Sequence, residues 1–323
     1  MKLLRLAPEN TKFGFMQLRR VSYPLSAALS IVAVLLFFFV GMNFGIDFSG
    51  GTQVELRAKA GQADIAALRV KGDSLGLGPV EVQRSGADTD AVLRLNLQPG
   101  GEAAQQTAVG KLRTAFAGDY EFRSVDAVGP RVSGELVQKG TLGIVVSILA
   151  VLTYLWFRFE WQFAIGAIIG TMHDLLLTVG FFCVTQLEFN TTSIAAILTI
   201  VGYSLNETVV VLDRIREVMR KYKKLSTAEI VDMSVNAVLP RTIMTATTVF
   251  LALLALFFLG GHVIRSFSAA MIWGIFVATY SSIFICSPML IYLGVRADTL
   301  DRPEDAAAMQ AAAKAQAASQ AKV

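Results

Sequence analysis

Six long apolar runs constrain this chain more than any other feature of its sequence. They cover roughly residues 25–46, 139–157, 162–184, 191–212, 239–259 and 267–293. Crossing a hydrocarbon core about 30 Å thick as a helix takes about 20 residues. Backbone groups in lipid must be hydrogen-bonded within their own segment, so the runs are predicted to be helices. Composition agrees, because only 17% of the residues are charged, whereas soluble domains typically have about 25%.

One run of this kind could be a buried helix of a soluble protein, but six in one chain favour membrane spans. Short segments rich in Lys and Arg lie on the cytoplasmic side of a membrane. Such residues gather before the first run and after the fourth, at Lys2, Arg5, Lys12, Arg19, Arg20, Arg214, Arg216, Arg220, Lys221, Lys223 and Lys224. Both ends of the chain are therefore predicted to be cytoplasmic.

The expected organisation follows from these spans. It comprises a cytoplasmic segment 1–24, a first transmembrane helix 25–46, an extracytoplasmic domain 47–138, a five-helix transmembrane core 139–295 and a cytoplasmic tail 296–323. The first run is too long for the apolar part of a signal peptide and has no A-x-A-like site after it, so we expect it to stay uncleaved. The tail is rich in Ala and Gln from Pro303 and is expected to be a loose helix or disordered.

The outside segment has the alternation of a small α/β unit. Strands are predicted at 52–58, 80–83, 91–97 and 120–128, and helices at 62–75 and 102–116. The order β-α-β-β-α-β is the ferredoxin-like pattern. The expected fold class is thus an α-helical membrane protein with six transmembrane helices and a small α+β ferredoxin-like extracytoplasmic domain. That domain contains no His or Cys and shows no catalytic constellation.

A glycine-rich stretch lies where the first span meets the outside domain. It contains Gly45, Asp47, Gly50 and Gly51. Glycines allow backbone turns that other residues resist, and Asp bonds nearby backbone groups in turns. The stretch is either a structural elbow or a moving hinge.

Charged and polar residues inside the apolar runs are the candidate functional residues. A charge at the bilayer centre costs roughly 2.5–3.5 kcal/mol on insertion scales and by default marks an ion or proton path. Glu207 and Asp174 lie deep in their spans, and Arg241 lies near the cytoplasmic end of the fifth. Arg241 could either extend its side chain to the interface or point inward to a partner. Asn206 and Thr245 could join helices by hydrogen bonds.

Proton coupling fits these residues better than ordinary catalysis. Burial and a nearby Arg shift a carboxyl pKa in opposite directions. If the distance between Glu207 and Arg241 changes with conformation, Glu207 would bind and release a proton in step. We therefore expect these two groups to face each other across neighbouring spans. The sequence has no HExxH, GxSxG or P-loop motif and no metal-ligand spacing, so neither an enzyme nor a cofactor is expected.

Four stretches carry a resemblance to a known family. They are Gly45-Ile46-Asp47-Phe48-Ser49-Gly50-Gly51-Thr52, His173-Asp174-Leu175, the stretch 202–217 that contains Leu205-Asn206-Glu207-Thr208, and the stretch from Arg241-Thr242 to Gly260-Gly261. In order and in loop length they resemble the SecF branch of the SecD/SecF family across nearly the whole chain.

The resemblance implies an accessory of the bacterial Sec translocon, driven by the proton motive force across the inner membrane. It implies SecD as a partner, forming the other half of a resistance–nodulation–division-type core. The SecYEG translocon, YajC and unfolded secretory polypeptide are further implied partners, within membrane lipid and without nucleic acid. The family's important intramembrane charges map to Glu207 and Arg241, with Thr245 one turn beyond. The best-known members carry Asp where this chain has Glu207, which keeps the carboxyl and lengthens its reach.

Two other functions stay open from the sequence. One is a small-molecule or lipid exporter with the same core, which would need a large apolar cavity in the outside domain. The other is a membrane scaffold in which the buried charges only hold helices together.

Overall fold

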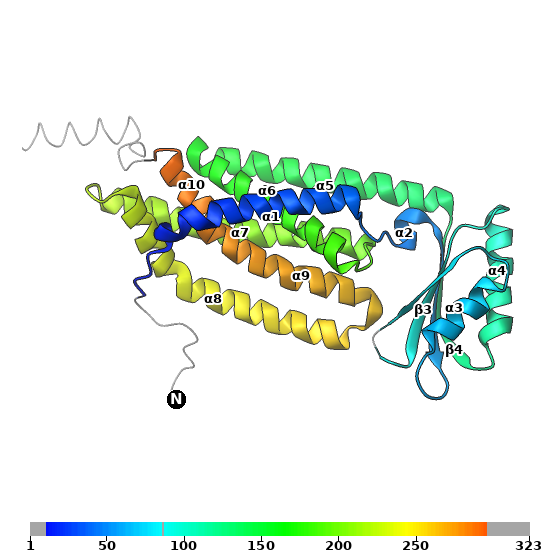
Figure 1. Cartoon of the computed structure of the whole chain (residues 1–323). Helices are drawn as coiled ribbons and strands as arrows, with labels where there is room; N and C mark the ends of the chain where they lie inside the picture. The colour runs from blue at the N-terminus through cyan, green and yellow to red at the C-terminus, as the bar shows by residue number, and fades with distance from the viewer. Residues whose placement is uncertain (1–10, 86, 296–323) are drawn as a thin grey trace, which may run out of the picture.

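A bundle of long helices carries a smaller sheet-containing domain at one end (Figure 1). This computed structural model describes residues 11–85 and 87–295. The predicted tail 296–323 and the first ten residues lie outside the described residues.

Within the described residues, six helices are long and apolar enough to cross a membrane, in agreement with the predicted fold class. Their parts are η1 Phe15–Leu18 with α1 Arg19–Phe39, α5 Pro130–Arg158, α6 Trp161–Thr185, α7 Thr191–Lys221, α8 Thr227–Leu259, and α9 Gly261–Ser281 continued by the π-helical turn η2 Ser282–Cys286 and α10 Ser287–Tyr292.

The ends of several helices follow from local residues. Asn190 and Ser193 form a reciprocal capping box that begins α7, and Ser226 with Glu229 begins α8 in the same way. α1 ends at Phe39, before the predicted residue 46. The backbone turns at Gly41, which has a φ of 75°, although the apolar sequence continues.

The helices differ in how much of their surface the chain itself covers. In the most apolar window, 61% of residues are buried in the last span, but only 6% in α5 and 11% in α8. The last span packs closely on α6, where a side chain at Gly166 would lie 3.2 Å from the Cys286 carbonyl oxygen. α6, α7 and the last span therefore form the centre of the bundle.

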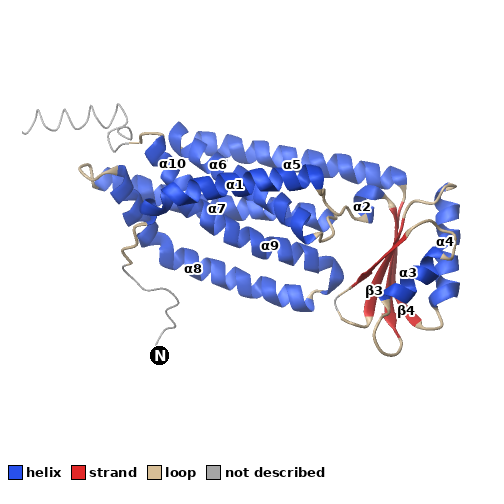
Figure 2. Cartoon of the chain, viewed as in Figure 1, coloured by secondary structure: helices blue, strands red, loops and turns tan. Residues whose placement is uncertain are grey.

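The smaller domain, which the sequence predicts to lie outside the membrane and which is called the outside domain below, is a four-stranded antiparallel sheet with two helices on one face (Figure 2). Its strands are β1 Gly51–Ala58, β2 Val80–Arg84, β3 Asp90–Leu95 and β4 Tyr120–Val128, in the order β2-β3-β1-β4. The helices are α3 Ile65–Asp73 and α4 Gly101–Phe116.

Alternation along the strands separates the two faces of this sheet. Val54 and Leu93 pack with Leu112 and Phe116 in an apolar core. Their strand neighbours Gln53 and Arg94 pair across β1 and β3 and point the other way. That second face meets the short helix α2 Ile46–Ser49 and the loop between α6 and α7.

Candidate functional site

Glu207 lies on α7 inside the bundle, with 4% of its surface exposed. The hydroxyl of Thr242, on α8, donates a hydrogen bond to its Oε1. This contact joins two spanning helices through a carboxyl group sheltered from solvent.

Arg241 does not meet Glu207. Its side chain is exposed on the surface of α8 and makes no ion pair with any described residue. Consecutive helical residues differ in direction by about 100°, since one turn takes 3.6 residues. Thr242 faces α7 and is buried, whereas Arg241 points about 100° around the helix from it and is exposed. The predicted contact between the acid and the base is thus absent within this chain.

Asp174 is the centre of a second buried cluster, with 1% of its surface exposed. Its Oδ2 accepts hydrogen bonds from Ser204 of α7 at 2.6 Å and from Ser281 of α9 at 2.8 Å. Nδ1 of His173 lies 3.1 Å from its Oδ1. One carboxyl group therefore connects all three central helices.

The two acids are linked through α7. Ser204 and Glu207 are three residues apart and lie on the same face of the helix. A proton arriving at either acid would meet a hydroxyl group, which both donates and accepts hydrogen bonds. The arrangement is suited to proton storage and transfer. Within the described residues, no group of three or more His, Cys, Asp or Glu could hold a metal ion.

Asn206 and Thr245 lie away from this cluster. Asn206 is exposed on α7, and Thr245 donates to the Arg241 carbonyl oxygen of its own helix at 2.9 Å. Sequence reasoning had missed Thr242, Ser204 and Ser281 as partners of the acids. A single hydroxyl in an apolar run carries too weak a signal to identify which helix it faces.

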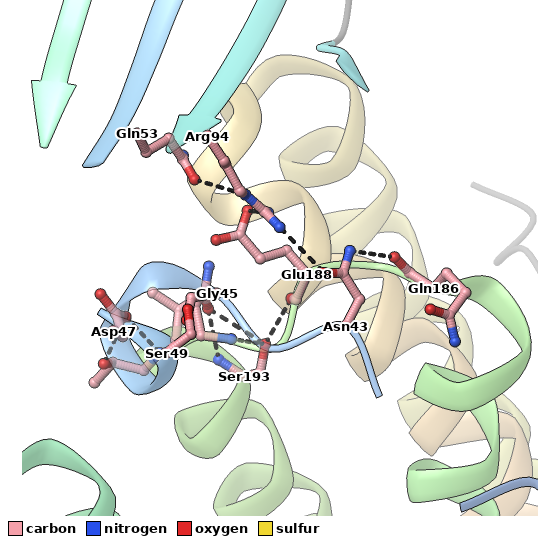
Figure 3. A network of polar contacts seen from close by, with 12 residues as sticks. Asn43, Gly45, Asp47, Ser49, Gln53, Arg94, Gln186, Glu188 and Ser193 are labelled. Atoms are coloured by element: carbon pink, nitrogen blue, oxygen red, sulfur yellow. Dashed lines mark hydrogen bonds and ion pairs between the residues drawn. The ribbon is translucent and has the colours of Figure 1, made fainter. Parts of the chain in front are cut away.

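The glycine stretch lies at the junction between the bundle and the outside domain (Figure 3). Asp47 Oδ2 accepts hydrogen bonds from the backbone N–H and the hydroxyl of Thr191, at 2.8 and 2.7 Å, where α7 begins. Gly51 has a φ of 124°, and a Cβ there would lie 2.3 Å from the Leu95 carbonyl oxygen. Gly50 is similarly constrained, with a φ of 72°. This packing favours a structural elbow over a free hinge.

A buried ion pair lies beside this elbow. Arg94 of β3 pairs with Glu188 of the loop between α6 and α7, and their side chains are 9% and 8% exposed. Two signals in the sequence could have found the pair. Arg94 is the basic residue inside an apolar strand, and Glu188 is the acidic residue of a short outside loop.

Two family models match the chain. "Protein export membrane protein SecD/SecF, C-terminal" covers residues 108–296, more than half of the sequence. The chain belongs to the SecD/SecF family. "SecD/SecF GG Motif" matches residues 35–61, which include the glycine stretch. The predicted family and the predicted role in Sec protein export are confirmed, and the chain is a multi-pass membrane protein.

Similar proteins differ in length. SecF of Rickettsia bellii is 43% identical over 296 residues, covering 89% of this chain and 95% of that protein. SecDF of Brucella abortus is 42% identical, but the match spans only 39% of its length. Both are named protein translocase subunits.

A crystal structure of SecDF from Thermus thermophilus, described as a translocon-associated membrane protein, matches with a TM-score of 0.80 and 34% identity. The match covers 88% of this chain and 39% of that one. The chain therefore matches nearly the whole length of the Rickettsia SecF protein but about two fifths of the length of the SecDF proteins.

Proposed function

We propose that this chain is the SecF half of a SecD–SecF pair in the bacterial inner membrane, and that it couples proton flow to the export of secretory polypeptides. The observation that carries the coupling is the pair of buried acids in the bundle. Asp174 and Glu207 are held by hydroxyl groups from neighbouring helices, so gain or loss of a proton at either would change how those helices contact each other.

The exposed charge on α8 supports the need for a partner. Arg241 lies on a helix that is apolar enough to span the membrane. Its side chain is exposed on the outer surface of the bundle. Such residues in lipid are rare and nearly always face protein or a water-filled cavity. A carboxylate on SecD is the natural counter-charge. Asn206, exposed on α7, would lie within the same contact.

The direction of transport follows from the charge of the short loops. With both ends of the chain cytoplasmic, the sheet domain lies outside, where a polypeptide leaves the SecYEG channel. YajC would belong to the same assembly. The membrane potential supplies about 2.3 kcal/mol for each charge per 100 mV. No enzymatic step is needed, since the work comes from proton movement.

Mutation of the charges tests the proposal. Glu207→Gln and Arg241→Met, expressed with SecD, should leave the complex assembled and abolish the part of export that depends on the proton gradient in inner-membrane vesicles. Glu217→Gln on the same helix is the matched control, because that side chain is 66% exposed. Gradient-dependent export at the wild-type level in the Glu207 variant would refute the coupling role and favour a scaffold.

A small-molecule exporter is the second candidate, because the outside domain has an open cleft of ≈ 690 Å³ between α4 and β4. Apolar residues line much of it, including Leu97, Val109 and Val125. If small-molecule efflux were its role, substitutions in the cleft such as Val109→Asp would change drug or lipid efflux and leave polypeptide export intact. We expect Val109→Asp to leave drug and lipid efflux unchanged.

A further inference from the structure

We propose that the buried pair Arg94–Glu188 is the linkage through which the central helices move the outside domain. This inference rests on the proposed function and assigns Arg94 and Glu188 as positioning residues that transmit motion. Neither residue is hydrogen-bonded to Asp174 or Glu207.

Arg94 connects three separate segments of the chain (Figure 3). Its Nη2 forms the ion pair with Glu188, its Nη1 donates to Asn43 Oδ1 at 3.1 Å, and its Nε donates to Gln53 Oε1 at 3.2 Å. Asn43 precedes the glycine stretch, and Gln53 is on the neighbouring strand. Each nitrogen of the guanidinium group is thus bound to a different element, which fixes the side chain in one orientation.

The Glu188 side of the pair is equally constrained. Its loop joins α6 to α7 in five residues, from Gln186 to Asn190. Phe189 of this loop exchanges backbone hydrogen bonds with the segment after α1, from its N–H to the Asn43 carbonyl and from the Gly45 N–H to its carbonyl, each at 2.8 Å. A Cβ at Gly45 would lie 2.4 Å from Glu188 Oε1. Gly45 therefore leaves the space that the carboxylate occupies.

The same loop is attached directly to both proton-carrying helices. α6 carries Asp174 and α7 carries Glu207. From the start of α7 at Thr191 to Glu207 is about 24 Å along the helix axis at 1.5 Å per residue. A tilt or shift of the pair α6–α7 at the level of the acids therefore displaces Glu188, and through Arg94 it displaces the sheet.

The burial of the pair explains why it can carry such a displacement. A screened surface ion pair contributes little and exchanges readily with water. When a pair is buried, loss of one partner leaves an unpaired charge in a poorly solvated site, which is strongly unfavourable. The domain and the outer end of α6–α7 should accordingly move as one body.

Uncoupling is the expected effect of breaking the linkage. With SecD present, Arg94→Gln should lower gradient-dependent export by about tenfold, in the range of measured coupling between sites. Proton conductance, which depends on Glu207 and Asp174, should stay at the wild-type level. Arg57→Gln is the control, because Arg57 is also an ion-paired arginine of this sheet but its partner Asp90 is in the same domain.

A crosslink tests the linkage even if the Arg94 variant assembles poorly. Arg94→Cys with Glu188→Cys, joined by a bifunctional thiol reagent whose spacer replaces the length of the two side chains, should retain gradient-dependent export, because the two positions stay together throughout the cycle. The native Cys183 and Cys286 are buried and do not compete.

Loss of export on crosslinking would overturn the proposal, as would full export by the Arg94→Gln variant. Failure of the linkage and failure of the proposed function are distinguishable. If only the linkage is wrong, Glu207→Gln still abolishes gradient-dependent export while Arg94→Gln leaves it unchanged.

Discussion

At the scale of single residues, the two intramembrane acids differ in their hydrogen-bond donors. Asp174 accepts from two serine hydroxyls, whereas Glu207 accepts from Thr242 alone among the described residues. Glu207 is therefore the acid whose environment changes most if one helix moves. This difference makes Thr242 a sensitive place to test the account.

Thr242→Val should impair coupling, because it keeps the shape of the side chain and removes the donor to Glu207. A hydrogen bond to a charged group contributes roughly 1.5–3 kcal/mol, and about 1.4 kcal/mol is a tenfold effect. We expect gradient-dependent export to fall by about tenfold or more, with Thr242→Ser close to wild type. Equal rates for the Val and Ser variants would show that the hydroxyl has no role.

Gly51→Ala should destabilise the outside domain. The residue would need a strained φ and would bring a Cβ to 2.3 Å from a backbone oxygen that cannot move aside cheaply. Strained backbone of this kind costs about 1–3 kcal/mol. Thermal unfolding of the full chain in detergent measures the loss. Gly110→Ala, in the middle of α4 with open space around it, should be neutral or stabilising.

The sequence could predict the burial of Glu207 and Asp174, because both lie deep in long apolar runs. It could not predict the direction of Arg241. Neighbouring residues of a helix point about 100° apart around its axis. Hydropathy places helix boundaries only to within several residues, so it does not define which side of the helix a given residue faces. The partners of the acids come from other helices, so their identity depends on packing that no single run encodes.

At the scale of elements, hydropathy located every span but not every helix end. The first helix runs from Phe15 to Phe39 rather than over 25–46, and α5 and α8 begin at Pro130 and Thr227, before the predicted 139 and 239. Val40, Met42, Phe44 and Ile46 continue the apolar pattern beyond Phe39, where the helix stops. Hydropathy does not register that Gly41 turns the backbone. In the outside domain the alternation of apolar and polar residues located all four strands.

The pair Arg57–Asp90 joins β1 to β3. The sheet should become less stable in acid, because protonation of Asp90 breaks this pair. The Arg57 guanidinium donates to the Asp90 carboxylate at 2.7 and 2.8 Å and holds the pKa of Asp90 below its usual range. Because the pKa of Asp90 is lower in the folded protein, the pair stabilises the fold at pH values above the pKa of Asp in the unfolded chain, about 3.9. This stabilisation is lost as the pH falls through the lower pKa that Asp90 has in the folded protein.

Hydrogen exchange of the β1 and β3 amides measures this effect. Protection factors should decrease below about pH 4 in the wild type. Asp90→Asn should remove the part of this decrease that protonation of Asp90 causes. An unchanged pH profile in the Asn variant would contradict the assignment.

At the scale of the whole molecule, the outer faces of the bundle differ in chemistry. The exposed side chains of α5 include Leu142, Val146 and Leu149, which suit lipid. The exposed face of α8 is also largely apolar, as at Leu251, but it carries Arg241 and Thr248 as well. We therefore expect SecD to contact α8 and lipid to contact α5.

Site-directed crosslinking in membranes tests this arrangement. Thr248→Cys should form a crosslink to SecD, and Val146→Cys, at an exposed position of α5, should form none. A crosslink to SecD from α5 alone would place the partner on the opposite side and would leave Arg241 without its proposed counter-charge.

The central claim is that protons pass through the buried acids of this chain and drive export. Proton flux into proteoliposomes that contain the chain with SecD tests it most directly, using an imposed gradient and a dye inside the vesicles. We predict that Glu207→Gln abolishes the flux, whereas Glu217→Gln and Arg94→Gln leave it at the wild-type rate. Wild-type flux in the Glu207→Gln vesicles would contradict the account.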